Sequence, residues 1–230
     1  MSKKHMKRQT APTTWRLDRK GSKFVTRSRP GKSLRLSMPI SLIFKEALKF
    51  CKTTKEVKSI LQDKEVIIDG KRRKDIRYPC GLMDVISLPV SNEYYRIVLS
   101  TKGKLTPVKI SNEEAGIKPC KIISKTMLKK GKFQLNFSDG RNLLTEKGNY
   151  TQGDVLVLKL PSHDIAEHLK IEAGHYALIT EGKLIGKQGT IESIDGNMVK
   201  LKNKDGVETL TIKKNIFVIG NKASSIKLAE

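Results

Sequence analysis

The sequence predicts an α+β N-terminal region followed by two mainly β regions, the last of them a small barrel. Three observations support this fold class. Apolar residues recur at helical spacing over two stretches between residues 38 and 61. Short apolar strands that end at Lys-Gly, Asp-Gly or Gly-Asp turns occupy residues 91–170. Five more short strands follow in residues 171–230, and we expect them to close into a barrel, because closure removes exposed strand edges.

The α+β region is expected to begin with two helices. Ser37 is positioned to cap the first helix, with Pro39 in its first turn. Thr53 and Glu56 have the spacing of a capping box, in which each side chain accepts a hydrogen bond from the other residue's backbone N–H. This box predicts the start of the second helix. Lysines lie around the remaining helical surface.

The stretch VIIDGKRRKD, residues 66–75, contains a strand, an Asp-Gly turn and four consecutive cations. Asp69-Gly70 is a strong signal for a two-residue hairpin. The cations are Lys71, Arg72, Arg73 and Lys74. Such a run is usually a solvated turn, and the same letters fit a nuclear signal. Its proximity to a basic N-terminal segment favours contact with RNA phosphates, which arginine binds through two parallel hydrogen bonds.

The charge balance favours a polyanionic partner. Lys and Arg number 46 against 23 Asp and Glu, which gives a net charge of +23 and a pI near 10.0. Residues 1–90 carry +15 of this charge, and residues 1–37 hold 12 cations and one carboxylate. Contact with phosphates relieves the repulsion and releases counterions, so nucleic acid is the expected partner. No membrane is expected, since the sequence has no apolar run of about 18 residues.

Residues 1–37 show no sustained periodicity and are interrupted by proline and glycine. A segment with so few apolar residues cannot offset its ordering entropy by burial, so we expect it to be extended and mobile when alone. It contains Trp15, the only tryptophan of the chain, which we expect to anchor the segment at one point.

Two features of the β regions carry further expectations. DIAEHLKI at 164–171 is expected to be a short helical connector, and Glu113 and Glu114 are expected to open a helical turn. In EGKLIGKQGT, residues 181–190, glycines that permit positive φ and close backbone approach alternate with lysines. This loop is either a tight turn of a barrel or a second phosphate-binding loop.

No catalytic or metal-binding pattern is present. The motifs GxxxxGK[ST], HExxH and GxSxG are absent. The four histidines do not pair with cysteines at metal-ligand spacing, and Cys51, Cys80 and Cys120 are too far apart for a zinc site. We therefore expect no enzymatic activity, no metal and no other cofactor, and reduced, buried cysteines in a cytosolic protein. The N-terminus lacks the apolar core of a secretory signal.

Four segments resemble one protein family in collinear order. KKHMKRQTAPTTW at 3–15 resembles the N-terminal signature of the S-four-e family of small-subunit ribosomal proteins of archaea and eukaryotes. IIDGKRRKDIRYPCGLMDVISL at 67–88 is similar to that family's S-four-type RNA-binding domain. EGKLIGKQGTIESI at 181–194 resembles its KOW motif, and NIFVIG at 215–220 resembles its closing strand. The C-terminal SSIKLAE lacks the longer basic tail of eukaryotic members, which favours an archaeal-type protein and makes a nuclear signal unnecessary.

The resemblance implies an architecture and a function. The implied parts are a basic extended N-terminal arm over 1–37, an S-four-type RNA-binding domain over 38–90, a central β-rich domain over 91–170, and a KOW-type, SH3-like β-barrel with a short C-terminal tail over 171–230. The implied function is that of a structural constituent of the small ribosomal subunit, which binds and stabilises folded rRNA through phosphate contacts. Expected partners are small-subunit rRNA and neighbouring ribosomal proteins, with no small-molecule substrate and no homo-oligomer. The expected location is cytoplasmic, on the ribosome.

Carried over by position, the rRNA contacts that the resemblance implies fall into three groups. The arm contributes Lys3, Lys4, Lys7, Arg8 and Arg16. The S-four-type surface contributes Lys45, Lys49, Lys52, Lys71, Arg72, Arg73 and Lys74. The KOW loop contributes Lys183 and Lys187, with Gly182, Gly186 and Gly189 as structural glycines.

Two other functions share parts of this pattern. S-four-type domains also dock the substrates of RNA-modifying enzymes, but these need a catalytic domain with an essential carboxylate, and residues 91–170 offer no convincing one. A KOW-bearing transcription or translation factor binds polymerase or ribosome transiently, whereas a constitutive ribosomal protein remains in salt-washed small subunits.

Overall fold

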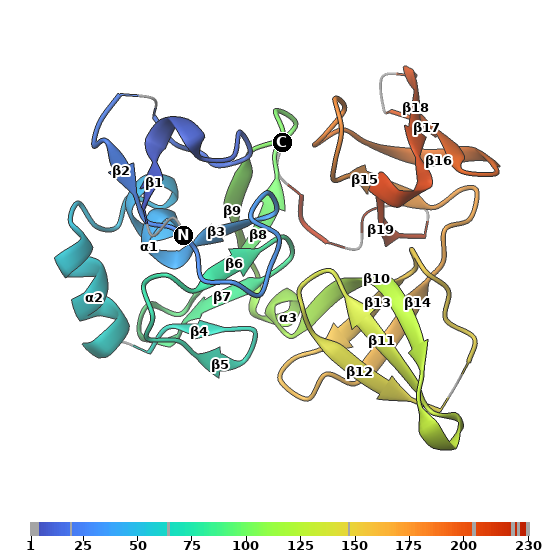
Figure 1. The fold of residues 1–230 in the computed structure, drawn as a ribbon, viewed down its shortest axis with the longest axis horizontal. Coiled ribbons are helices and arrows are strands. Elements are labelled where there is room, and N and C mark those ends of the chain that lie inside the picture. The colour runs from blue at the N-terminus through green and yellow to red at the C-terminus, as the bar shows by residue number, and fades with distance from the viewer. Residues whose placement is uncertain are drawn as a thin grey trace. The chain divides into compact units, whose positions relative to one another are not determined.

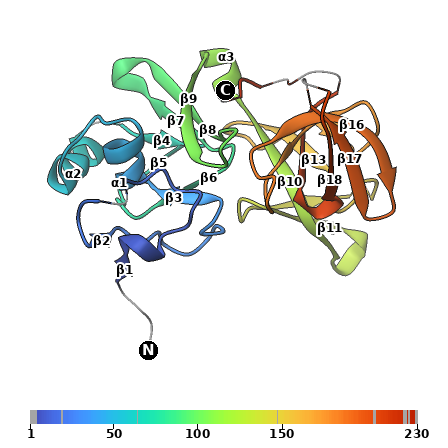
Figure 2. The ribbon, with the colours of Figure 1, turned by 90° about the horizontal axis from the view of Figure 1, so that it is seen from above.

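The computed structural model of the 230-residue chain describes residues 5–18, 20–63, 65–146, 148–203, 206–221, 224 and 226–228. The chain divides into two units (Figures 1 and 2). Unit 1 comprises residues 1–98 and 104–116, and unit 2 comprises residues 99–103 and 117–230. The structure is mostly β with few helices, as the sequence predicts.

Unit 1 is built on one five-stranded sheet and two short strand pairs. The strands are β1 Met6–Lys7, β2 Phe24–Val25, β3 Ser37–Pro39, β4 Ile67–Ile68, β5 Lys71–Arg72, β6 Pro79–Gly81, β7 Val85–Leu88, β8 Glu93–Leu99 and β9 Leu105–Ile110. The sheet has the order β5-β4-β7-β8-β9, and the pairs are β1 with β2 and β3 with β6. Ile68 lies opposite Ile86 and both are fully buried, which ties the β4–β5 hairpin to the core.

Both predicted N-terminal helices are present and lie side by side (Figures 1 and 2), the first with a different start. The helical segments of unit 1 are η1 Arg8–Thr10, α1 Ile40–Leu42, the π-helical η2 Ile43–Ala47, α2 Thr54–Asp63, η3 Pro89–Ser91 and α3 Asn112–Ala115. Ser37 does not cap α1, contrary to the prediction, but lies in β3 and donates its hydroxyl to Ser33 O. A residue before proline disfavours helical backbone angles, so Met38 stays extended and the helix begins after Pro39.

The predicted capping box of α2 is confirmed. Glu56 N–H donates to Thr53 Oγ1 at 3.2 Å, and the Glu56 carboxylate accepts from the backbone N–H groups of Lys52 and Thr53. These hydrogen bonds, with that of Lys52 foremost, hold the pKa of Glu56 below its usual value. The helical turn expected at Glu113 and Glu114 is α3.

The N-terminal segment differs from the extended arm expected of it when alone. It contains the β1–β2 pair, in which Met6 lies opposite Val25 and both side chains are buried. Trp15 is 1% exposed, which confirms it as an anchor. Hydrogen bonds of Trp15 with Leu34 and Ser37 join the two halves of the segment, and hydrogen bonds with residues 104–105 fix it to the rest of unit 1. These tertiary contacts supply the burial that the segment's own composition cannot.

Unit 2 contains two five-stranded sheets. The first has the order β12-β11-β10-β13-β14, with β10 Ile117–Met127, β11 Phe133–Phe137, β12 Asn142–Thr145, β13 Val155–Lys159 and β14 Ile165–Leu169. The second has the order β18-β17-β16-β15-β19, with β15 Tyr176–Ile179, β16 Gln188–Asp195, β17 Met198–Lys202, β18 Glu208–Ile212 and β19 Ile216–Gly220. Short helical turns, η4 Lys129–Gly131 and η5 Lys213–Asn215, lie between strands. The five C-terminal strands are as predicted, but in the described part of the chain no pairing of β18 with β19 closes their sheet.

The helical connector expected at residues 164–171 is wrong. This segment forms β14, which pairs with β13 so that Leu169 lies opposite Val155. His168 Nε2 lies 2.9 Å from the Asp154 carboxylate and so fixes the strand from its side. Local preference for a helix is weak, and pairing with a buried strand overrides it.

Candidate nucleic-acid interface

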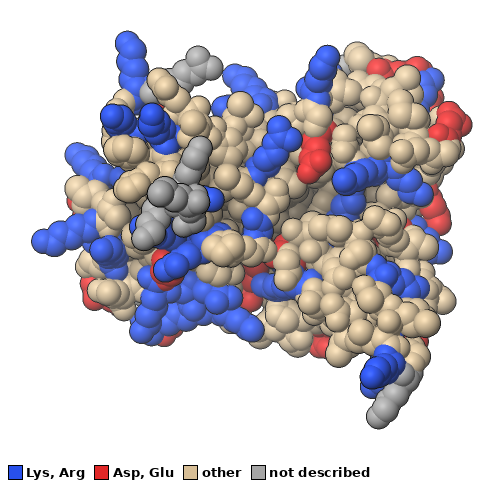
Figure 3. All heavy atoms as spheres, viewed as in Figure 1, with Lys and Arg blue, Asp and Glu red and all other residues tan. Residues whose placement is uncertain are grey.

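Unit 1 carries most of the net charge of the chain. It holds 26 Lys and Arg against 11 Asp and Glu, a net charge of +15, and unit 2 carries the remaining +8. Figure 3 shows Lys and Arg side chains gathered over the β4–β5 hairpin and around α2. A polyanion is therefore attracted most strongly to unit 1.

The β4–β5 hairpin presents the basic run. Asp69 and Gly70 have φ angles of 50° and 76°, the left-handed pair that a two-residue type I′ turn requires. The Asp69 carboxylate accepts a hydrogen bond from Val85 N–H at 2.9 Å, which fixes the turn to β7. The predicted hairpin is confirmed, and its second strand begins with the first cation of the run.

The two arginines of the run are held by unit 1 itself. Arg72 Nη2 donates to Gln62 O in the last turn of α2 at 3.0 Å, and Nη1 lies 3.7 Å from the Glu65 carboxylate. The Arg73 guanidinium lies 4.4 Å from the centroid of the Tyr78 ring, a cation–π contact. Burial raises the pKa of the Tyr78 hydroxyl, so the ring stays neutral beneath the cation. Each arginine thus has a structural role whether or not RNA is bound.

The two lysines of the run are open to solvent. Lys71 and Lys74 are exposed, and neither side chain has an ion pair or a hydrogen bond with any residue that the structure describes. Such a cation gives up no internal contact when it binds phosphate. Lys71 and Lys74 are therefore the members of the run that phosphate binds at least cost.

The lysines expected on the helical surface differ in exposure. Lys45, on η2, is half-buried, whereas Lys49 and Lys52 are exposed. The φ angle of Lys49, 57°, ends the helical segment. Two further exposed lysines on α2, Lys55 and Lys58, were not singled out from the sequence. Their positions relative to the apolar residues of that helix place them on its polar face and could have predicted their exposure.

Trp15 and Thr14 fix the basic N-terminal segment within unit 1. Its indole Nε1 donates to Ser37 O at 2.7 Å and to Leu34 O at 3.1 Å. Next to it, Thr14 O accepts a hydrogen bond from Leu105 N–H at 2.7 Å. The cations of this segment are thereby held on the same unit as those of the hairpin.

Arg8 is a clamp within the N-terminal segment. Its side chain is 10% exposed. Nε donates to Ser22 O at 3.0 Å, Nη1 donates to Asp18 O at 2.7 Å, and Nη2 pairs with the Glu46 carboxylate at 3.3 Å. Most of its donors are used within the chain, which leaves Arg8 less suited to phosphate than an exposed cation.

The other cations expected in the N-terminal segment fall into two classes. Lys7 and Arg16 are exposed, whereas Lys3 and Lys4 lie outside the described residues. Further exposed cations of unit 1 that sequence reasoning missed include Lys20, Lys23, Arg27, Arg35 and Arg77. No motif marks them, and only the excess of cations in residues 1–37 pointed to most of them.

The glycine and lysine loop at residues 181–190 belongs to unit 2. Lys183 is exposed, and Lys187 is half-buried. The backbone carbonyl of Lys187 accepts a hydrogen bond from Ile179 N–H at 2.9 Å, which holds the loop against β15. The two lysines of the loop are therefore a separate set from the cations of unit 1.

The glycines of this loop make close backbone approaches. Gly186 has a φ of 88°, and a Cβ at this position lies 2.1 Å from Ser100 O, where no side chain fits. At Gly189 a Cβ lies 2.5 Å from Lys202 O across the β16–β17 pair. Gly182 has a φ of 93° and more open surroundings. Gly186 and Gly189 are thus needed for chain packing, independently of any ligand.

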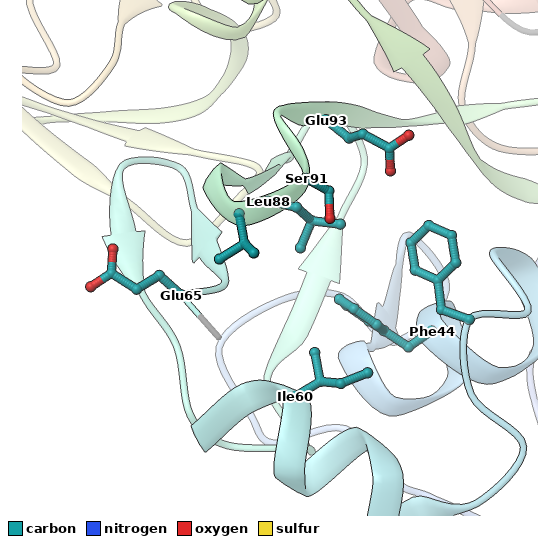
Figure 4. A pocket seen from close by; sticks show the side chains of 8 residues that line it. Phe44, Ile60, Glu65, Leu88, Ser91 and Glu93 are labelled. Atoms are coloured by element: carbon teal, nitrogen blue, oxygen red, sulfur yellow. The ribbon is translucent and has the colours of Figure 1, made fainter. Parts of the chain in front are cut away.

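Unit 1 also has an apolar hollow of about 250 Å³ (Figure 4). It is lined by side chains from η2 and α2, from the segments that follow these two helices, and from the end of β7 to the start of β8: Phe44, Phe50, Ile60, Glu65, Leu88, Val90, Ser91 and Glu93. Figure 4 shows Glu65 and Glu93 on opposite sides of the hollow. Because carboxylates repel phosphate, the hollow does not belong to the basic surface.

The described residues hold no group of three or more His, Cys, Asp or Glu side chains able to bind a metal ion. Cys51, Cys80 and Cys120 are buried, as expected. In the same part of the chain, no helix has both the length and the apolar character needed to cross a membrane.

Comparison with known proteins identifies the family. The model described as "Ribosomal family S4e" matches residues 91–165, and the RS4NT (NUC023) domain model matches residues 2–31. The small ribosomal subunit protein eS4 of Methanocaldococcus jannaschii is 39% identical over 98% of each chain. The protein of the same name from Methanococcus vannielii is 37% identical over 95% of this chain and 94% of its own length.

A solved structure agrees with this relationship. The crystal structure of the 30S ribosomal protein S4e from Thermoplasma acidophilum has a TM-score of 0.70 and 32% sequence identity, covering 83% of this chain and 96% of that one. The resemblance noted in the sequence is confirmed, and these relatives are archaeal, as predicted. The chain belongs to the S4e family of ribosomal proteins, in its archaeal form.

Proposed function

We propose that this chain is a structural constituent of the small ribosomal subunit that binds and stabilises folded small-subunit rRNA through phosphate contacts. The observation that carries the proposal is the set of exposed cations without internal partners on the folded hairpin of unit 1, Lys71 and Lys74. Phosphate neutralises such cations and displaces counterions, which drives binding. Family membership and the names of the archaeal relatives support the same role.

The proposed interface has three parts. Residues 38–90 act as the S-four-type RNA-binding domain, with the hairpin cations and the exposed helical lysines as its surface. Residues 1–37 act as a basic arm that carries Lys7 and Arg16 to the same rRNA. Residues 171–230 act as the KOW-type domain, in which Lys183 is the exposed cation that supports a further phosphate contact.

The mode of recognition follows from composition. Aromatic residues, which could stack on bases, make up only 5% of the chain, whereas 46 of its 230 residues are Lys or Arg. Recognition of the backbone and shape of folded RNA therefore outweighs reading of bases. We infer a chain that performs no catalysis and uses no cofactor, and that works in the cytoplasm as one copy beside neighbouring ribosomal proteins.

Sedimentation tests the subunit assignment. Small subunits from cells that make this protein are washed at moderate salt and sedimented through a sucrose gradient, and the protein is followed with an antibody. We expect it to remain in the small-subunit fractions, because many phosphate contacts dissociate together only at high salt. Recovery only among free proteins contradicts the assignment and fits a transient factor instead.

A further inference from the structure

The β1–β2 pair exposes an aromatic ring on its outer face. In this pair Met6 lies opposite Val25, and both side chains point inward, with exposures of 7% and 8%. Lys7 lies opposite Phe24 on the other face, since side chains alternate along a strand. Phe24 is 49% exposed there. The strand register therefore presents a phenylalanine ring to solvent beside a lysine.

Cationic and imidazole groups surround this ring. The His5 ring centroid lies 5.6 Å from that of Phe24, with the two planes tilted by 52°. Lys23 Nζ lies 5.7 Å from the Phe24 centroid. Neither Lys7 nor Lys23 forms a side-chain ion pair or hydrogen bond with a described residue. Among the described residues, no carboxylate therefore neutralises the two lysines that flank the ring.

We propose that Phe24 stacks on an unpaired base of RNA while Lys7 and Lys23 contact the phosphates on either side of that base. This inference rests on the proposed rRNA binding. A single exposed phenylalanine needs no explanation by itself, but here two lysines without a carboxylate partner among the described residues lie beside the half-exposed ring, Lys7 across the strand pair and Lys23 next to it in the chain. An unpaired nucleotide offers the matching combination, a flat π surface between two phosphates. An apolar protein side chain matches only the ring.

Phe50 provides a matched contrast within the same unit. It is 46% exposed, close to the exposure of Phe24, but it lines the apolar hollow together with Glu65 and Glu93. The carboxylates of Glu65 and Glu93 in this hollow repel the phosphates that flank a base. Exposure of an aromatic ring alone therefore does not predict stacking, and Phe50 serves as the control position.

The test compares single-stranded and duplex RNA. The full chain is titrated with a fluorescently labelled oligouridine of about ten nucleotides and with a duplex of equal length. We expect Phe24→Leu to weaken binding of the single strand at least about five-fold, the lower end of the range for one stacked base, and to change duplex binding less than two-fold. Phe24→Trp should retain binding, and Phe50→Leu should leave both affinities unchanged. An unshifted Trp15 emission maximum shows that the two leucine variants are folded, and an unchanged circular dichroism spectrum shows the same for Phe24→Trp.

Two results overturn the inference alone: an unchanged single-strand affinity in Phe24→Leu, or equal losses for single strand and duplex. The first result also leaves an apolar protein partner as the occupant of this face. A different result, no affinity of the unmodified chain for either RNA, overturns the proposed rRNA binding itself. The two failures are thus distinguished by the behaviour of the unmodified chain.

Discussion

The indole nitrogen of Trp15 donates a hydrogen bond to the backbone carbonyl of Ser37 at 2.7 Å. This bond joins the basic N-terminal segment to the strand that leads into α1. The ring itself is 1% exposed and is among the largest fully buried side chains of the chain. The relationship helps to explain how a segment of low apolar content becomes part of a folded unit, because a buried indole joins the start of the segment to its end.

Replacing Trp15 by leucine should lower the free energy of unfolding by about 2 kcal/mol or more, somewhat below the cost of about 3–5 kcal/mol for cutting a buried aromatic residue back to alanine. Denaturant unfolding followed by circular dichroism measures the change. The exposed control Val90→Ala, at a position 66% exposed, should change stability by no more than about 0.5 kcal/mol. Equal stabilities of Trp15→Leu and the control would show that the indole is not an anchor.

The buried ion pair of unit 2 should be needed for its stability. Lys118 Nζ lies 2.8 Å from the Asp139 carboxylate, and their side chains are 1% and 5% exposed. Asp139→Asn removes the negative charge that lies against the buried ammonium, so unfolding should become easier by about 3–5 kcal/mol.

The surface pair of Lys132 and Glu146, 51% and 81% exposed, gives the control for this experiment. Glu146→Gln should change stability by less than about 1 kcal/mol, because solvent screens an exposed pair. Similar effects of Asp139→Asn and Glu146→Gln in thermal unfolding would contradict the role of burial.

The ammonium of Lys121 should make stability depend on alkaline pH. It is buried and donates to the backbone carbonyls of Lys214 and Ile216, and burial lowers its pKa from 10.5 to about 8. Between these values the unfolded chain binds more protons than the folded chain, so this group makes the free energy of unfolding rise with pH, by at most about 3 kcal/mol.

Lys121→Met removes this titration. The difference in unfolding free energy between the unmodified chain and this variant should increase from pH 8 to pH 10.5 and stay level below pH 8. Measuring both proteins cancels the contributions of other titrating groups. A difference that is flat across this range would mean that the folded-state pKa of Lys121 is not lowered.

Gly186→Ala should destabilise unit 2 more than Gly174→Ala. The two glycines have nearly equal φ angles, 88° and 89°. A Cβ at Gly186 meets Ser100 O at 2.1 Å, whereas at Gly174 it meets nothing within 4 Å. Both variants bear the strain of a positive φ, about 1 kcal/mol, and only Gly186→Ala adds overpacking, about 1–3 kcal/mol. Indistinguishable unfolding midpoints would show that the backbone adjusts freely at Ser100.

Short sequence motifs that determine their own backbone conformation, such as a capping box or a hairpin turn, predicted the structure well. Thr53 and Glu56 marked the start of α2 because the side chain of each accepts a hydrogen bond from the backbone N–H of the other. Asp69-Gly70 marked the hairpin because few other residue pairs adopt the positive φ angles of its turn. Ser37 misled because its fit to a cap ignored the restriction that Pro39 imposes on the residue before it.

The local sequence pattern did not predict which strands pair or which side chains contact residues distant in the sequence. Residues 165–169 form the strand β14 because they pair with β13 through backbone hydrogen bonds. The N-terminal segment folds in part because a carbonyl distant in sequence, that of Ser37, accepts a hydrogen bond from the Trp15 indole. For the same reason the run of four cations did not reveal that Arg72 and Arg73 have internal partners while Lys71 and Lys74 do not. Those partners come from α2 and from Tyr78, which the local sequence pattern does not bring together.

The central claim is that unpartnered cations of unit 1 bind rRNA phosphates, and the salt dependence of binding tests it most directly. The affinity of the full chain for small-subunit rRNA is measured at several salt concentrations for the unmodified chain and for the double variant Lys71→Gln and Lys74→Gln. A control double variant, Lys132→Gln and Lys170→Gln, removes the same charge from exposed lysines of unit 2 that pair with carboxylates. We chose Lys71 and Lys74 because the arginines of the run have structural roles.

We expect the slope of log affinity against log salt concentration to be steep for the unmodified chain. It should become shallower by about 1.5 in the Lys71 and Lys74 variant, since each lost phosphate contact contributes about 0.7–0.9. The control variant should keep the original slope and nearly the original affinity. A shallow slope for the unmodified chain, or equal losses in the two double variants, would contradict phosphate binding by this surface.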